Sequence, residues 1–123
     1  MKIFYILYNK LFGQQIFKEA LEAYFYKLPN IINVEWFRDD GFIIGKIHSD
    51  GKVIMTQGKD ADDFIEMVNS AIQTAYDIPK NYYKTLKNIK AYSPPSNEKN
   101  KLEDITIKKS HLLLYRKQQF KTA

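Results

Sequence analysis

The sequence predicts an α+β fold, in which a three-stranded antiparallel meander is covered on one face by one amphipathic helix. Three observations support this prediction. Asp-Gly pairs at 40–41 and 50–51 lie between apolar runs, where they favour tight hairpin turns. Residues 31–37 alternate between apolar and polar side chains, as expected for a strand with one buried face. Residues 60–77 carry apolar side chains at helical spacing.

The three strands of the meander are predicted from β-branched and aromatic runs that the two Asp-Gly pairs separate. They are expected at residues 31–37, 42–48 and 52–56. Gly45 lies inside the second strand, where a bulge or the close approach of another backbone is a common reason for glycine. A small sheet is stable only when its apolar face is buried, so this meander requires a cover.

The cover is predicted to be a helix that begins at Asp60 and ends before Pro79. The Asp60 carboxylate is suited to accept a hydrogen bond from a free amide of the first turn. Asp63, three residues later, gives a variant of the capping box with Asp in place of Glu. Acidic residues in a first helical turn also interact favourably with the helix dipole, and no neighbouring His or Cys completes a set of metal ligands. We therefore expect these carboxylates to be structural.

The first thirty residues are interpreted as an N-terminal extension, with a strand at 2–8 and a helix at about 14–27. The helix carries an aromatic-rich stripe that packs on the sheet or, as an alternative, binds a partner or a membrane surface. Loose attachment of the whole extension is a third interpretation. No cleavage site follows the apolar start and no run is long enough to span a bilayer, so we expect neither a signal peptide nor a membrane-spanning segment. With the stripe packed on the sheet, we expect no membrane partner. The stripe consists of Phe17, Leu21, Tyr24, Phe25 and Leu28.

Residues 93–123 are interpreted as a linker followed by a basic strand and tail, which leaves residues 31–92 as the core domain. The stretch 93–100 reads Ser-Pro-Pro-Ser-Asn-Glu-Lys-Asn, the composition of a linker. Residues 105–116 are expected to be extended. This late strand either pairs with the meander as a fourth strand or, as an alternative, belongs to a segment in which His111 is catalytic.

Charge is distributed unevenly along the 123 residues. Residues 1–77 hold eight Lys/Arg and eleven Asp/Glu, a net charge of −3, whereas residues 78–123 hold eleven and three, a net charge of +8. A basic C-terminal third that also contains tyrosines is a candidate for contact with nucleic acid, although lysines that only keep the tail soluble explain the same pattern. The candidate contact residues are Lys84, Lys87, Lys90, Lys108, Lys109, Arg116 and Lys117. The absence of cysteine excludes disulfides and thiolate metal sites and is typical of a cytoplasmic protein.

The junction from strand to helix, Thr56 to Phe64, resembles that of the N-terminal domain of HicB-like antitoxins. The family's junction reads T-x-G, a polar residue, a capping residue, two variable residues and then Glu-Ala. Thr56 and Gly58 match this motif. Asp60 stands at the cap and Asp63 at the acidic position, while Phe64 departs from the usual Ala. The Gly-Phe-Ile-Ile-Gly run at 41–45 also resembles the second strand of the family, and the resemblance spans residues 31–77.

This resemblance implies a partial RNase H fold and an antitoxin of a type II toxin-antitoxin system, which binds and neutralises a small basic ribonuclease toxin. It implies no catalysis and no cofactor or metal, and it suggests a homo-oligomer that also binds operator DNA. The main alternative is a nucleic-acid-binding accessory domain that uses the basic C-terminal third. A ribonuclease is a more distant alternative, because Lys109-Ser110-His111 is similar to the Gly-Ser-His of HicA-like toxins, with Lys109 in place of the glycine. Loss of RNA cleavage in a His111→Ala variant would distinguish it.

Overall fold

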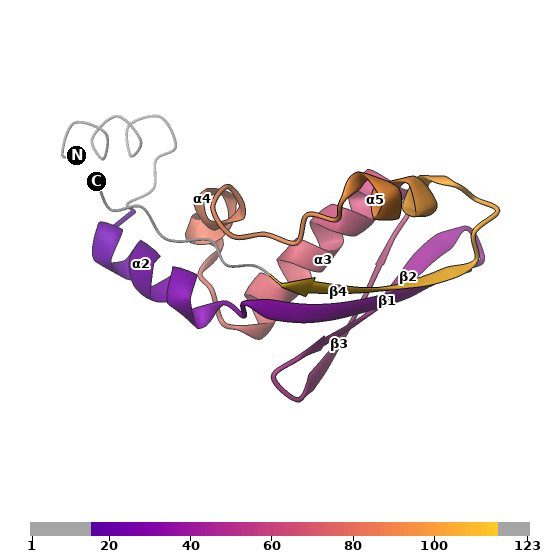
Figure 1. Ribbon diagram of the computed structural model, residues 1–123. Helices are drawn as coiled ribbons and strands as arrows, with labels where there is room; N and C mark the ends of the chain where they lie inside the picture. Colours follow the sequence, from indigo (N-terminus) through magenta and orange to yellow (C-terminus); the bar gives the residue numbers. More distant parts are fainter. Residues whose placement is uncertain (1–15, 116–123) are drawn as a thin grey trace.

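A four-stranded antiparallel sheet with helices on one side forms the structure, which is a computed structural model describing residues 16–115 (Figure 1). In chain order the elements are α2 (Lys18–Lys27), β1 (Ile31–Asp39), β2 (Phe42–Ser49), β3 (Lys52–Gly58), α3 (Ala61–Ala75), the 3-10 turn η1 (Lys80–Tyr82), α4 (Tyr83–Lys87), α5 (Ser96–Glu103) and β4 (Lys109–Tyr115). The strands are arranged in the order β3-β2-β1-β4. The α+β class, the meander and its helical cover are thus as predicted.

Both Asp-Gly pairs form tight turns in the meander. Asp40 and Gly41 have φ values of 51° and 83°, and Asp50 and Gly51 have φ values of 49° and 76°. Positive φ at both central residues is the geometry that joins antiparallel strands without splaying them. The ladders between β1 and β2 and between β2 and β3 are then continuous from end to end.

Helix α3 covers the sheet through a fully buried aromatic side chain, Phe64. A Cβ atom built on Gly45 would lie 2.7 Å from the Phe64 ring, and one built on Gly58 would lie 2.5 Å from the Phe64 backbone. The lack of a side chain at Gly45 therefore leaves room for the Phe64 ring of the helix. The continuous ladder excludes a bulge at this position. Phe64 is thus accommodated by the absence of a side chain at Gly45, and it fills the space between helix and sheet.

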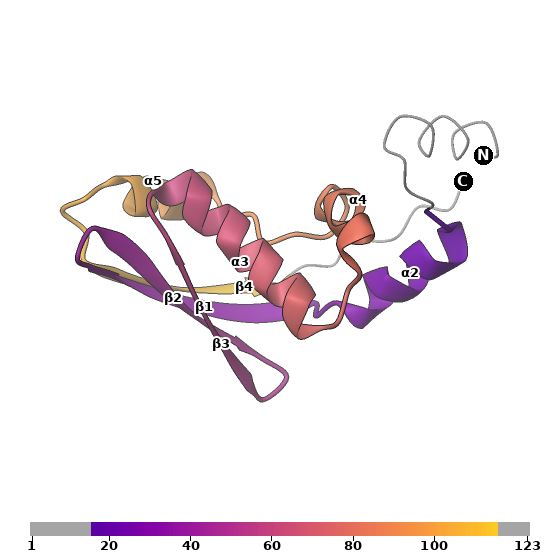
Figure 2. The ribbon, with the colours of Figure 1, turned by 180° about the vertical axis from the view of Figure 1, so that it is seen from behind.

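The late strand joins the sheet as β4, which pairs antiparallel with β1. A chain that returned to the sheet directly after α3 would run parallel to β3, and therefore parallel to β1. The segment through α4 and α5 carries the chain back along the helical layer first, so β4 enters from the opposite end (Figures 1 and 2). The linker interpretation is wrong for residues 96–100, which belong to α5, because Leu102 is buried in the core and anchors this helix.

Arg38 at the end of β1 fixes the segment that connects α5 to β4. Its guanidinium donates hydrogen bonds to the main-chain carbonyls of Lys101, Leu102 and Asp104 at 2.6–3.0 Å and to that of Ile107 at 2.7 Å. The planar fork of donors suits several acceptors at once. Asp104 adds a local turn, in which hydrogen bonds from Thr106 hold the pKa of its carboxyl below the ordinary value.

Helix α2 packs on the rest of the molecule, which settles the question of attachment for residues 16–30. Phe25 and Leu28 of the predicted stripe are buried in the common core, whereas Phe17 is 51% exposed. Tyr24 meets Tyr82 edge-on, with ring centroids 4.9 Å apart. The predicted strand at 2–8 lies outside the described residues. Within 16–115, none of the helices has the length and apolar character needed to cross a membrane.

Candidate binding surface on the open face of the sheet

Within residues 16–115, one face of the sheet carries no helical cover. Helices α3, α4 and α5 lie on the same side of the sheet, and we call the opposite side the open face (Figures 1 and 2). Strand alternation and register determine which side chains point there. The open face includes Ile31, Asn33, Glu35 and Phe37 on β1, Phe42, Ile44, Lys46 and His48 on β2, Val53, Met55 and Gln57 on β3, and Lys109 and His111 on β4.

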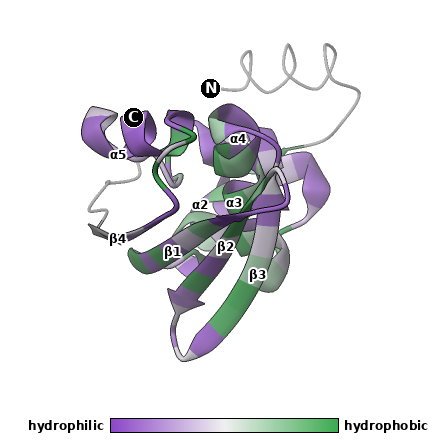
Figure 3. Cartoon of the chain, turned by 90° about the vertical axis from the view of Figure 1, so that its right-hand side faces the viewer, coloured by the Kyte–Doolittle hydropathy of each residue, from purple (hydrophilic) through white to green (hydrophobic). Residues whose placement is uncertain are grey.

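Large apolar side chains are exposed on this face. Val53 is 58% exposed and Met55 54%, and both lie on the edge strand β3, which Figure 3 shows with one long hydrophobic stretch. Phe37 on β1 is 42% exposed and lies opposite half-buried Ile44. We call Val53 and Met55 the β3 patch. Period-two alternation in the third predicted strand was the sequence signal that could have placed both side chains on one face.

A charged cluster surrounds Glu35 at the centre of the open face. The His48 ring and the Glu35 carboxylate form a hydrogen bond, with 2.6 Å between Nε2 and Oε1. Lys46 on β2 and His111 on β4 lie directly opposite Glu35 on its two sides. The chain contains two histidines, so both of them flank the same carboxylate. The β4 side of this cluster opens into a groove of about 420 Å³, which is lined by Glu35, Trp36, Phe37, Lys46, Lys109, Ser110 and His111.

The residues of the strand-to-helix motif have structural roles. The Asp60 carboxylate accepts a hydrogen bond from the Asp63 amide at 2.9 Å, and the Asp63 carboxylate accepts one from the Lys59 amide at 2.8 Å. Thr56 points toward α3, where its hydroxyl donates to the Met67 carbonyl at 3.4 Å. Together with the close approach at Gly58, these contacts fix the sharp turn into the helix.

The lysines proposed for nucleic-acid contact do not form one surface. Lys84 and Lys87 are exposed on α4, while Lys108 and Lys109 lie at the start of β4, far from α4 in Figure 1. Lys90 is 7% exposed and its ammonium is used inside the protein, so its assignment to such a surface is wrong. The last two candidates, Arg116 and Lys117, lie outside the described residues.

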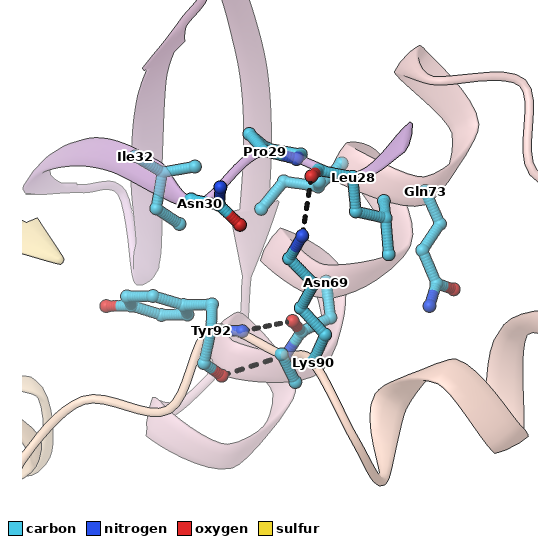
Figure 4. Close-up of a pocket in the computed structure, with 10 residues that line it drawn as sticks. Leu28, Pro29, Asn30, Ile32, Asn69, Gln73, Lys90 and Tyr92 are labelled. Atoms are coloured by element: carbon cyan, nitrogen blue, oxygen red, sulfur yellow. Dashed lines mark hydrogen bonds between the residues drawn. The ribbon is translucent and has the colours of Figure 1, made fainter. Parts of the chain in front are cut away.

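Lys90 instead anchors the end of helix α2 (Figure 4). Its ammonium donates to the carbonyls of Phe25 and Leu28 at 2.8 and 2.7 Å, two acceptors that the end of the helix leaves unpaired. Burial lowers the pKa of this amine. The adjoining cavity of about 30 Å³ is lined by Asn69, whose amide pairs with both backbone groups of Tyr92. A space of this size accommodates about one water molecule, so we regard it as structural.

A second hollow of about 210 Å³ lies beside the start of α3. Asp60, Asp62 and Glu103 line it together with Arg38 and Lys59, so charges of both signs meet there. Within residues 16–115, the structure contains no group of three or more His, Asp or Glu side chains placed to hold a metal ion. Comparisons of the chain with protein-family models, with curated proteins and with solved structures found no match.

Proposed function

We propose that this chain is a non-enzymatic, antitoxin-like protein that binds a protein partner through the open face of its sheet. The observation that carries the proposal is the exposure of Val53, Met55 and Phe37 on one uncovered face. Large exposed apolar side chains that share a face are typical of interaction sites, and the fully buried centre of an interface is more apolar than its rim. The HicB-like junction motif supports the antitoxin role within this class.

The partner proposed is a small basic ribonuclease toxin. Asp39 and Asp40 border the open face at the turn between β1 and β2, next to Phe37. Charges at the rim of an interface contribute to the rate of encounter and to partner choice more than to affinity, so this acidic rim favours a basic partner. Self-association and binding of operator DNA stay predictions that rest on the resemblance alone.

The proposal is tested by capture of partners from the native lysate with the tagged protein, in two halves with and without nuclease treatment. A small basic protein retained in both halves is expected, together with loss of its ribonuclease activity once it is bound. Nucleic acid captured in the untreated half, with no small basic protein retained in either half, would instead favour the accessory-domain alternative. Ribonuclease activity of the purified chain itself, lost in His111→Ala, would contradict a non-enzymatic role.

A further inference from the structure

The groove on the β4 side of the open face combines two cationic side chains with an exposed aromatic ring. Lys46 lies opposite Glu35 on β2, and Lys109 lies opposite Phe37 on β4, so the two ammonium groups come from the strands on either side of β1. Both lysines are exposed, and both line the groove. Neither belongs to the β3 patch, so the groove is a separate feature of the same face.

Phe37 supplies a platform between these lysines. Its side chain is 42% exposed and lines the groove beside Lys109 and His111. Proteins that bind single strands combine cationic side chains along the backbone with aromatic rings on which bases stack. Direct stacking on an aromatic ring also explains why unpaired nucleotides, rather than duplexes, are recognised on such surfaces.

Among the described residues, Glu35 is the one carboxylate that lines the groove, and its negative charge opposes the binding of an anion. The hydrogen bond from His48 at 2.6 Å occupies one of its oxygens and places a titratable ring beside it. The balance of formal charge among the lining side chains, two lysines against one carboxylate, stays positive with the histidines neutral.

We propose that this groove binds single-stranded nucleic acid, with phosphates paired to Lys46 and Lys109 and a base stacked on Phe37. This binding does not require the protein partner proposed above, although Phe37 belongs to both surfaces. It also places the nucleic-acid contact on the sheet rather than on the basic C-terminal third, of which only Lys109 contributes.

The test measures fluorescence anisotropy of a labelled ten-nucleotide oligouridylate with the full chain in 50 mM and 200 mM salt. Binding is expected to weaken with salt, because phosphate contacts release counterions. Lys46→Glu combined with Lys109→Glu is expected to weaken binding at least tenfold, and Phe37→Ala roughly fivefold to a hundredfold, the range for loss of one stacked base. Glu35→Gln, which removes the opposing charge, is expected to tighten binding severalfold.

Lys27→Glu combined with Lys87→Glu is the matched control, because it makes the same change in net charge at two exposed lysines on helices away from the open face. This double variant is expected to bind like the wild type, and circular dichroism verifies that every variant is folded. Absence of binding in 50 mM salt would overturn the proposal. Equal loss in the control variant, or weaker binding by Glu35→Gln, would also overturn it, because either result would assign binding to net charge or to another surface.

Discussion

At the scale of the residue, the side-chain size that position 45 tolerates depends on the side chain at position 64. The fully buried Phe64 ring occupies the space that a side chain at Gly45 would need, with only 2.7 Å to a built Cβ. Protein interiors are packed so densely that one added carbon atom disturbs the packing and lowers stability. The requirement for glycine in the middle of β2 is therefore imposed by the helix above it.

Gly45→Ala is expected to lower the free energy of unfolding by about 1–3 kcal/mol, because the added methyl group overpacks the core. Urea unfolding followed by the fluorescence of Trp36, the single tryptophan, measures this change. Lys46→Ala, which changes the next side chain along the strand on the open face, is the control and is expected to stay within about 0.5 kcal/mol of the wild type.

Combining Gly45→Ala with Phe64→Leu tests the contact directly. The smaller side chain makes room for the methyl group, so the double variant is expected to lose less stability than the two single variants together, as contacting residues do. Strictly additive losses would contradict a direct contact between these two residues.

At the scale of the element, α3 depends on the hydrogen bonds that its first turn receives. Asp60→Ala is expected to lower the free energy of unfolding by about 1 kcal/mol, because the Asp63 amide loses its acceptor. Asp62→Ala is the control in the same turn, since the Asp62 carboxylate is 83% exposed and forms an ion pair with Lys99 at 3.4 Å. We expect a smaller loss from it in the same urea measurement. Equal losses would show that the charge of the turn matters more than the cap.

Helix α2 depends on a contact from a distant part of the chain. Lys90→Met keeps roughly the length of the side chain but removes the ammonium that donates to the carbonyls of Phe25 and Leu28. We expect a loss of about 1–3 kcal/mol, the usual cost of unpaired buried acceptors. In this variant, amide hydrogen exchange is expected to become faster in α2 than in the wild type, while exchange in α3 changes much less. Lys87→Met, an exposed neighbour, is the control, and unchanged exchange in α2 would exclude the anchoring role.

Sequence patterns predicted the elements whose signals are local. The two Asp-Gly turns, the alternation of β1 and the cap of α3 each follow from a few adjacent residues, and all three are present in the structure. Helix α5 was missed because Ser-Pro-Pro-Ser resembles a linker, whereas the helix is stabilised by burial of Leu102 and by the Arg38 contacts, which are distant in sequence. The direction of β4 was likewise undetermined, since it depends on the path through α4 and α5.

The same distinction applies to the candidate surfaces. The basic C-terminal third suggested one cationic surface, but charge counted along a sequence does not say which side chains are buried, and Lys90 proved to be internal. The open face could be anticipated only from the alternation of Val53 and Met55 combined with the knowledge that α3 covers the other side. The position of His111 opposite Glu35 required the register of β4 with β1.

At the scale of the whole molecule, residues 16–115 form a two-sided structure, with a helical layer over one face of the sheet and the open face opposite it. Residues from α2 to α5 contribute to one buried cluster, so the helical side is closed by the chain itself. The open face retains exposed Val53, Met55 and Phe37 as well as the edge of β3. We therefore expect binding to occur on the sheet, which makes the open face the centre of the functional proposal.

The most direct test of this proposal compares two methionines that differ in the side of the molecule on which they lie. Met55 on the open face is 54% exposed and Met67 on α3 is 40% exposed. Capture of the small basic partner from the native lysate is measured with the wild type, Met55→Asp and Met67→Asp. We predict that Met55→Asp loses at least nine-tenths of the captured partner and that Met67→Asp retains it. Equal capture by both variants, or loss through Met67→Asp alone, would contradict the assignment of the open face.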